Sequence, residues 1–275
     1  MALFQCDMFS ESTFSSTTVN VILPTPNEGA EPGGDNRHYP KDGEKYQVLY
    51  LLHGFSGDYS DWQRNSGIER YAQEKRVAVV MPSGGNSFYQ NLPCGRNYSD
   101  FILEELPAFV QGVFPVSAKR EHNFIAGLSM GGYGAFLSAL RKPGQYAAAA
   151  SLSGAVWRFE DTPVLEPGAD VVFPVTKPLL HAFGEGFERY DRATCDVATM
   201  LQNAVDGGVD LPKLYQCCGT GDFLYADNLK FKAFAETLDI DYTYAEGPGL
   251  HDFDFWDPYI RRVLDWLPLT GGFVD

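Results

Sequence analysis

Short, nearly continuous apolar runs alternate along the chain with longer segments in which apolar residues recur every three or four positions. Runs of the first kind are typical of strands that a parallel sheet buries on both faces. They occupy residues 46–52, 77–81, 123–126, 146–152, 213–218 and 242–245. Segments of the second kind are typical of helices, and they occupy residues 99–113, 130–141, 193–205, 228–238 and 257–267. The alternation predicts an α/β fold with a mostly parallel, doubly wound sheet.

The start of the chain follows a different pattern. From Gln5 to Leu23 apolar and polar residues alternate loosely, and serine and threonine separate the apolar positions. This alternation predicts an N-terminal antiparallel hairpin that opens the sheet.

Two helix starts are predicted from capping residues. Ser99 precedes the helical spacing of residues 102–113 and would cap that helix, with a kink at Pro107. Asp257 followed by Pro258 is typical of a cap and a first helical position, so the last helix is expected to begin there.

Periodicity is lost in two segments that are rich in turn-forming or acidic residues. Residues 27–43 contain glycine, proline, aspartate and glutamate, which indicates an exposed loop. Residues 154–190 mix prolines with aromatic and acidic residues, which indicates an insertion over the sheet, a candidate lid. The rest of the pattern is continuous, so we expect one domain spanning residues 1–275.

The charge balance narrows the class of partner. Lys and Arg number 21 against 36 Asp and Glu, a net charge of −15 that repels nucleic acid and anionic membrane surfaces. No apolar run reaches the length of a membrane span, and the N-terminus lacks the basic and apolar regions of a signal peptide. The five cysteines have no metal-type spacing, and this odd number favours a reducing compartment over a disulfide framework. These observations predict a cytoplasmic protein with a small-molecule substrate, and they leave a homo-oligomer open.

One pentapeptide carries candidate chemistry. Gly127–Gly131, with the sequence Gly-Leu-Ser-Met-Gly, lies between the apolar run 123–126 and a predicted helix. This arrangement is typical of a nucleophile elbow, the strand-to-helix turn that presents a serine hydroxyl in a cleft. Glycines that each cost about 1 kcal/mol relative to alanine open the helix, so close backbone packing is expected there; they are Gly131, Gly132 and Gly134.

A nucleophilic serine needs a histidine base and a carboxylate that orients the base. Of the two histidines after Ser129, His251 directly follows a predicted strand and a Gly-Pro-Gly turn, whereas His181 lies in the candidate lid. Asp222 follows the preceding strand in Gly-Thr-Gly-Asp. Three other aspartates remain as rival acids, although the first is better placed to cap a helix; they are Asp227, Asp206 and Asp210.

The oxyanion of an acyl-transfer intermediate needs two backbone donors. The amide of Met130, the residue after the serine, is one candidate, and the amide of Phe55, in the loop after an early strand, is the other. His53 is expected to orient that loop rather than to act in catalysis. Three aspartates near the C-terminus alternate with phenylalanine as on a solvated face, so no metal site is predicted at Asp252, Asp254 and Asp257.

Seven segments together resemble a known family; they are Leu51–Gly54, Asp61–Trp62, Val80–Pro82, Glu105–Pro107, Phe124–Gly134, Cys218–Tyr225 and His251–Asp252. They look like bacterial tributyrin esterases, within the esterase D and S-formylglutathione hydrolase group, from about Val19 to Leu267. The resemblance implies the α/β-hydrolase fold and a serine carboxylesterase that hydrolyses short acyl esters, including acetyl or feruloyl esters, without a cofactor. It also implies roles for five residues, with Ser129, Asp222 and His251 as catalytic triad and Phe55 and Met130 as oxyanion donors.

Three alternatives stay open. An S-formylglutathione hydrolase would use the same triad, but Leu128 stands where we expect histidine in that subgroup. An acyltransferase differs only in which acceptor reaches the acyl-enzyme. A non-catalytic protein on a hydrolase fold would be favoured by loss of a triad residue, and all three are present.

Overall fold

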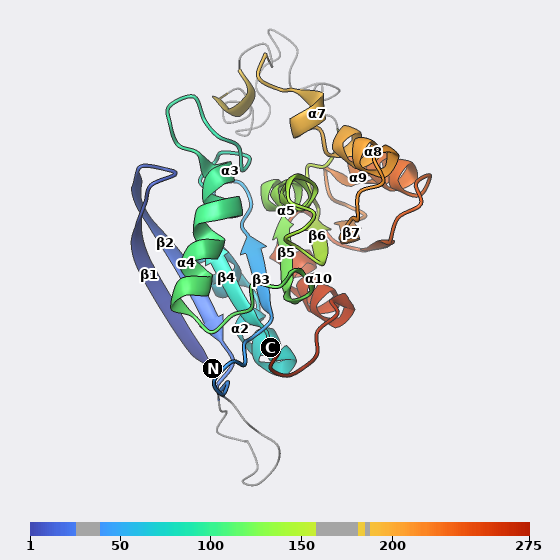
Figure 1. Cartoon of the computed structure of the whole chain (residues 1–275). Coiled ribbons are helices and arrows are strands. Elements are labelled where there is room, and N and C mark those ends of the chain that lie inside the picture. Colours follow the sequence, from blue (N-terminus) through green and yellow to red (C-terminus); the bar gives the residue numbers. More distant parts are fainter. Residues whose placement is uncertain (26–38, 158–180, 185–187) are drawn as a thin grey trace.

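An eight-stranded sheet runs through the computed structural model (Figure 1), which describes residues 1–25, 39–157, 181–184 and 188–275. The strands lie in the spatial order β1-β2-β4-β3-β5-β6-β7-β8. Their bounds are β1 Ala2–Ser10, β2 Ser15–Leu23, β3 Val48–Leu52, β4 Ala78–Pro82, β5 Asn123–Leu128, β6 Ala148–Leu152, β7 Lys213–Gly219 and β8 Tyr242–Gly247. The pairs β1·β2 and β2·β4 are antiparallel, and the remaining pairs are parallel. The predicted mostly parallel sheet with an N-terminal hairpin is therefore confirmed.

Helices cover both faces of this sheet. Their bounds are α1 Asp61–Asn65, α2 Ile68–Lys75, α3 Tyr98–Asp100, α4 Leu106–Val113, α5 Met130–Arg141, α7 Arg192–Cys195, α8 Val197–Asp206, α9 Tyr225–Ala235 and α10 Phe253–Trp266. One hydrophobic core lies between the sheet and α4, α5, α8 and α9, and a second lies between the opposite face and α1, α2 and α10. Every residue of β3, β4, β5 and β6 is buried, as their continuous apolar character predicts.

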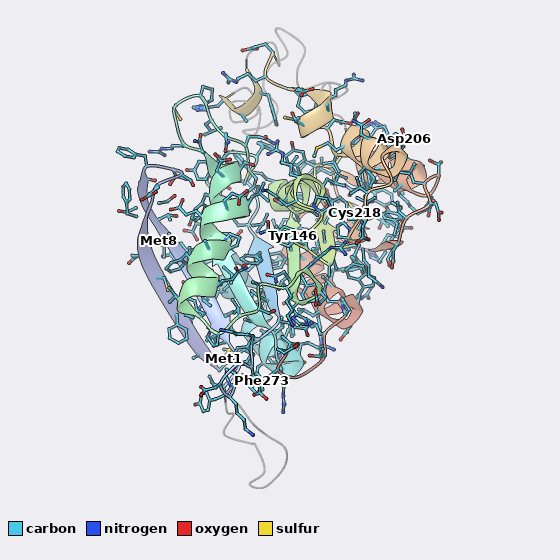
Figure 2. The ribbon with its side chains drawn as sticks, viewed as in Figure 1. Met1, Met8, Tyr146, Asp206, Cys218 and Phe273 are labelled. Carbon is cyan, nitrogen blue, oxygen red and sulfur yellow. The ribbon has the colours of Figure 1, made fainter. Side chains whose placement is uncertain are left out.

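The five cysteines form no disulfide framework. All five are free, and Cys217 and Cys218 are fully buried in β7. Figure 2 labels Cys218 and Tyr146 inside the molecule, whereas Met8 lies at the margin formed by the hairpin. The burial of two adjacent cysteines follows from the two-sided packing of a central strand.

The helix before α4 differs from the prediction. Ser99 lies inside α3, and Asn97 precedes that helix, so Ser99 is not the cap. Residues Phe101–Glu105 form a π-helical turn that joins α3 to α4, and Pro107 stands in the first turn of α4. Proline has no N–H to offer the carbonyl four residues earlier, which explains why the backbone widens there instead of continuing as a regular α-helix.

The last helix begins earlier than predicted. Asp252 caps α10, and its carboxylate accepts a hydrogen bond from the Phe255 amide at 3.4 Å. Asp257 is therefore not the cap, and Pro258 lies within the helix. The Asp257 carboxylate instead accepts hydrogen bonds from the Gly67 amide at 2.7 Å and the Tyr71 hydroxyl at 3.1 Å. Asp257 thus ties α10 to α2 across this face of the sheet.

The candidate lid lies largely outside the described residues. Of the predicted insertion 154–190, the structure describes residues 154–157, 181–184 and 188–190. Most of the exposed loop predicted for residues 27–43 also lies outside them. Both assignments stay predictions.

Candidate active site

Ser129 stands at the junction of β5 and α5 in a conformation that few residues adopt. Its φ is 54° and its ψ is −119°, whereas L-residues other than glycine rarely have positive φ. The Ser129 amide donates to the Leu152 carbonyl at 2.9 Å, which fixes the turn against β6. This sharp turn between a buried strand and a helix is the geometry that the Gly-x-Ser-x-Gly pattern predicts.

The glycines around the serine are explained by close contacts that leave no room for a Cβ atom. A Cβ atom at Gly131 would lie 2.5 Å from the His53 carbonyl oxygen and 2.6 Å from that of Leu52. Cβ atoms at Gly127 and Gly134 would overlap the backbone of Gly131 and the ring of Tyr89. Glycine is required at Gly131 because α5 packs directly on the end of β3. It is required at Gly127 because the turn folds back onto the start of α5, and at Gly134 because the Tyr89 ring packs against that helix.

The variant Gly131→Ala is expected to be strongly destabilised. The new methyl group would meet two backbone oxygens, which cannot rotate away, so β3 and α5 would have to separate. Overpacking of this kind costs about 1–3 kcal/mol, and more where backbone must move. Chemical denaturation should show the loss, with Gly144→Ala as control because nothing lies within 4 Å of a Cβ there. Equal stability of Gly131→Ala and wild type would contradict this account.

The structure brings Ser129, His251 and Asp222 together from three separate loops. Nε2 of His251 lies 2.9 Å from the Ser129 hydroxyl, and Nδ1 lies 2.8 Å from Oδ2 of Asp222. The Asp222 side chain is fully buried, and the side chain of His251 is 17% exposed. An ionised aspartate can only accept, so it selects the tautomer with hydrogen on Nδ1 and leaves Nε2 free to accept the serine proton.

Two glycine-bearing loops place Asp222 and His251 side by side. The Thr220 amide donates to the Gly247 carbonyl at 2.9 Å, and the Gly221 amide donates to the Gly249 carbonyl at 3.0 Å. A Cβ at Gly219 would lie 2.5 Å from the Gly249 carbonyl oxygen. The loop after β7 and the loop after β8 are therefore held together directly.

Aromatic rings that the sequence did not single out enclose His251. The Phe223 ring centroid lies 4.4 Å from that of His251, and Trp256 meets it edge-on at 4.9 Å. Their positions, directly after Asp222 and one helical turn into α10, become informative only once the fold is known. The two rings pack against the imidazole from a loop and from a helix.

The rival site residues lie elsewhere. Asp227 pairs with Lys230 at 2.8 Å within α9, Asp210 pairs with Arg120 at 2.8 Å, and Asp206 accepts from Gln202 at 2.8 Å. The His181 carbonyl accepts from Arg189 at 2.8 Å. Among the described residues, Asp222 is the carboxylate in contact with His251.

The loop that carries Phe55 lies against the serine. A Cβ at Gly54 would lie 3.4 Å from Cβ of Ser129, which places the start of this loop beside that serine. Met130 opens α5, and N–H groups in the first turn of a helix have no partner within it. The positive end of the helix dipole adds to the attraction for a negative oxygen at this point.

His53 is an architectural residue, as predicted. Its ring is fully buried, with Nδ1 2.6 Å from the Gly54 carbonyl and Nε2 accepting from the Gly84 amide at 2.8 Å. Nε2 accepts a hydrogen bond, so the ring is neutral and carries its hydrogen on Nδ1. Burial lowers the pKa of His53, which keeps it neutral. The imidazole therefore fastens the loop after β3 to the loop after β4.

The Cys218 thiol adjoins the buried carboxylate without competing with it. Burial, and secondly the charge of Asp222, raise the pKa of Cys218 to about 12. The thiol is therefore neutral at physiological pH, and it adds no second negative charge beside Asp222.

Several large aromatic residues in the loops and helices around the serine belong to the core. Four of them are at most 2% exposed: Trp62, Phe88, Tyr89 and Phe183. The Tyr89 hydroxyl donates to the His53 carbonyl at 2.8 Å, so this ring supports the loop beside the serine. Trp157 is partly buried against the same core.

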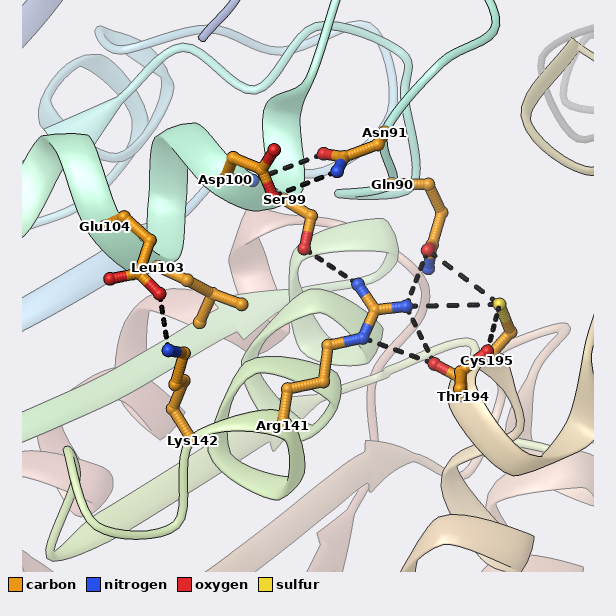
Figure 3. A pocket seen from close by; sticks show the side chains of 10 residues that line it. All are labelled: Gln90, Asn91, Ser99, Asp100, Leu103, Glu104, Arg141, Lys142, Thr194 and Cys195. Atoms are coloured by element: carbon orange, nitrogen blue, oxygen red, sulfur yellow. Dashed lines mark hydrogen bonds and ion pairs between the residues drawn. The ribbon is translucent and has the colours of Figure 1, made fainter.

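A polar pocket of about 420 Å³ lies away from the serine, near the far end of α5 (Figure 3). At its centre, Arg141 donates to the Ser99 hydroxyl at 2.8 Å, the Gln90 side-chain oxygen at 2.8 Å and the Thr194 carbonyl at 2.7 Å. Lys142 pairs with Glu104 at the rim. The Arg141 guanidinium therefore joins α5 to α7 and to the loop after β4.

The acidic residues near the C-terminus do not converge on a common point. Asp252 and Asp257 serve as helix cap and as acceptor for α2, as described above. Over the described ranges, no group of three or more His, Cys, Asp or Glu side chains could hold a metal ion.

The comparison with known proteins identifies the family. The Esterase family model ("Putative esterase") matches residues 10–194. An acetyl esterase of Caldicellulosiruptor saccharolyticus is 31% identical over 97% of this chain and 98% of its own length. The chain belongs to the Esterase family. It is a serine esterase, a carboxylic ester hydrolase with the α/β-hydrolase fold.

Solved structures resemble this esterase over its whole length. The fluorophosphonate-binding serine hydrolase F of Staphylococcus aureus is 33% identical, with a TM-score of 0.82 and coverage of 97% of this chain and 98% of that one. The S-formylglutathione hydrolase of Staphylococcus aureus is 32% identical, with a TM-score of 0.80 and the same coverage. None of the helices in the described part of the esterase is long and apolar enough to cross a membrane.

Proposed function

We propose that the esterase hydrolyses short acyl esters, acetyl esters foremost, with Ser129 as nucleophile, His251 as base and Asp222 as the orienting acid. The observation that carries this proposal is the continuous hydrogen-bonded line from Asp222 through His251 to the Ser129 hydroxyl. The full-length similarity to an acetyl esterase supports the choice of acyl group.

The geometry supports a two-step reaction. His251 Nε2 takes the hydroxyl proton as Ser129 Oγ attacks the ester carbonyl, and the amides of Phe55 and Met130 would donate to the resulting oxyanion. His251 then returns the proton to the departing alcohol, which leaves an acyl-serine. Water then attacks this acyl group while His251 takes a proton from the water. The second tetrahedral intermediate expels Ser129 Oγ, which receives that proton from His251, so the carboxylic acid is released and the neutral serine and histidine are restored. Asp222 stays ionised throughout and stabilises the imidazolium.

Packing around the first turn of α5 supports a small acyl group. Phe88, Tyr89 and Tyr133 are buried there, and the Phe88 and Tyr133 rings lie 6.2 Å apart, edge to face. Side chains that fill this region leave little space for a long acyl chain on that side of the nucleophile.

A thioesterase acting on S-formylglutathione is the second candidate, and the similarity to the hydrolase of that name favours it. The net charge of −15 opposes it, because the glutathione group is anionic. The buried Leu128, where we expect histidine in that subgroup, opposes it as well. Acyl transfer to an alcohol acceptor needs no change in the triad.

A substrate series tests the proposed chemistry. We expect kcat/KM for p-nitrophenyl esters to be highest for acetate and to fall with chain length, and to exceed kcat/KM for S-formylglutathione. Methyl ferulate and acetylated xylan test bulkier ester substrates. Product analysis with added alcohol tests acyl transfer to an alcohol. A preference for S-formylglutathione by an order of magnitude would replace acetyl esters as the assignment.

Fluorophosphonate labelling tests the nucleophile separately from the substrate. A fluorophosphonate probe should phosphonylate Ser129 with loss of fluoride, and peptide mass spectrometry should find the label on the peptide that contains it. A label on another serine would contradict the assignment.

The free cysteines and the acidic charge further support a reducing, cytoplasmic setting and a small-molecule partner.

A further inference from the structure

The outer edge of β1 is long and exposed. The strand covers nine residues, Ala2–Ser10, and among the described residues it pairs with β2 alone. Figure 1 shows it as the outermost element of the sheet on that side. Edge strands of this kind present unpaired N–H and C=O groups to solvent, and soluble proteins usually protect such edges with charges, prolines or bulges. β1 contains no proline and a single charged residue, Asp7.

Large apolar side chains accompany the exposed edge. Leu3, Phe4 and Phe9 are 41%, 42% and 56% exposed, and Phe14 at the hairpin tip is 81% exposed. Phe9 and Phe14 stack edge to face with their centroids 5.7 Å apart. Phe14 also has a φ of 49°, a conformation unusual for a bulky residue. Phe9 and Phe14 thus form one exposed aromatic pair at the hairpin tip, whereas Leu3 and Phe4 lie near the other end of β1 on opposite faces of the sheet. Exposed apolar side chains on a free strand are typical of an interface.

The hairpin tip that presents these rings is held rigidly. The Glu105 carboxylate accepts from the Ser10 hydroxyl at 2.8 Å, the Glu11 amide at 2.9 Å and the Ser12 amide at 3.0 Å. The Asn97 amide donates to the Ser12 carbonyl at 2.9 Å. The exposed aromatic pair is therefore attached to a fixed support, which lowers the entropy cost of binding a partner.

The sequence of β1 is nearly palindromic in the polar or apolar character of its residues. The sequence Ala-Leu-Phe-Gln-Cys-Asp-Met-Phe-Ser is symmetric in character about Cys6: polar residues flank it, two apolar residues follow on each side, and a small residue ends each arm. We propose that two copies of this chain pair antiparallel along the outer edges of β1, about a two-fold axis at Cys6.

In this register, side chains of like character lie opposite each other on both faces of the joined sheet. Residues directly opposite each other in antiparallel strands share a face. Phe9 would meet Leu3 of the second copy on the face away from α4, where Asp7 would also meet Gln5. On the other face Met8 would meet Phe4, whose ring already lies 5.4 Å from that of Phe114. Each pair occurs twice, because a two-fold interface uses one patch from both copies.

Charge selects this axis over its neighbours. Oδ1 of Asp7 accepts from the Thr18 hydroxyl at 2.6 Å, which leaves Oδ2 for the amide of Gln5 from the second copy. Moving the axis to Asp7 would bring two carboxylates together, and like charges directly opposite are destabilising. Moving it to Gln5 would place Asp7 opposite Leu3. The axis at Cys6 is the one that pairs polar with polar and apolar with apolar side chains.

Substitutions at Gln5 test the pairing without touching the active site. Analytical ultracentrifugation of the wild type should show a concentration-dependent dimer of twice the 30.5 kDa chain mass. Gln5→Glu places a carboxylate opposite Asp7 and should weaken the dimer about tenfold, whereas Gln5→Lys places an ammonium there and should strengthen it. Both variants should keep the wild-type circular dichroism and turnover of p-nitrophenyl acetate, which shows that they are folded.

Cysteine cross-linking tests the axis itself. In a Cys94→Ser background, which removes the exposed cysteine, copper phenanthroline under air should accept two electrons from a pair of Cys6 thiolates and yield a disulfide-linked dimer. Addition of Cys6→Ser should abolish that band. A wild type that is monomeric at the highest soluble concentration would overturn the proposal. So would a dimer whose dissociation constant does not respond to Gln5→Glu or Gln5→Lys, because the interface would then lie elsewhere.

Discussion

Ser129→Ala is expected to lower kcat for p-nitrophenyl acetate by about 10⁵- to 10⁶-fold, the scale seen when a triad serine is removed from serine proteases. Without Oγ no acyl-enzyme can form, and only the remaining oxyanion donors and substrate binding accelerate the reaction with water. Because His251 and Asp222 remain in place, KM should change little. Steady-state kinetics with carefully purified protein gives the measurement.

Ser138→Ala is a matched control for this loss. Ser138 lies later in α5 and is buried, but it has no part in the triad. It should retain activity near that of the wild type. Turnover by Ser129→Ala within tenfold of the wild type would remove Ser129 from the nucleophile's role.

Asp222→Asn is expected to lower kcat by about 10⁴-fold with the protein still folded. An amide can donate to Nδ1, which would stabilise the tautomer with hydrogen on Nε2, and this tautomer cannot accept the serine proton. The imidazolium formed during the reaction would also lose its buried counter-charge. The loss should therefore appear in kcat and kcat/KM together, as for an interaction made in the transition state.

Asp227→Asn is the control for Asp222→Asn. Asp227 lies five residues away and pairs with Lys230 on the exposed side of α9, so its substitution should change kcat less than about twofold. The opposite pattern, a large loss for Asp227→Asn and none for Asp222→Asn, would transfer the acid's role to Asp227.

The elements nearest the serine could be predicted from sequence because their signals are local. The strand before Ser129 has no polar side chain after Asn123, the helix after it ends at Arg141 as predicted, and the glycines indicate close packing by their cost alone. The loops that follow β7 and β8 were likewise predicted from a strand followed by glycine. The structure places Asp222 and His251 there within hydrogen-bonding distance of each other.

Other features depend on partners that are distant in sequence. The start of α10 was predicted wrongly because Asp257 resembles a cap until its partners in α2 are known. The rings of Phe223 and Trp256 around His251 could not be predicted either, since they converge from a loop and a helix only in the folded chain. The sequence therefore predicted the polar side chains that meet at this site better than the aromatic rings around them.

The contact between the loops after β7 and β8 couples Asp222 to His251 and leaves Ser129 on a separate part of the fold. Asp222 and His251 lie on two loops whose backbones are hydrogen-bonded to each other, whereas Ser129 lies at the junction of β5 and α5. Thermal fraying that begins at β8, the edge strand with half-exposed residues, would move Asp222 and His251 together away from Ser129. The enzyme would then lose activity reversibly, because the pair of Asp222 and His251 and the serine would separate without either part unfolding. Activity would return when β8 pairs with β7 again.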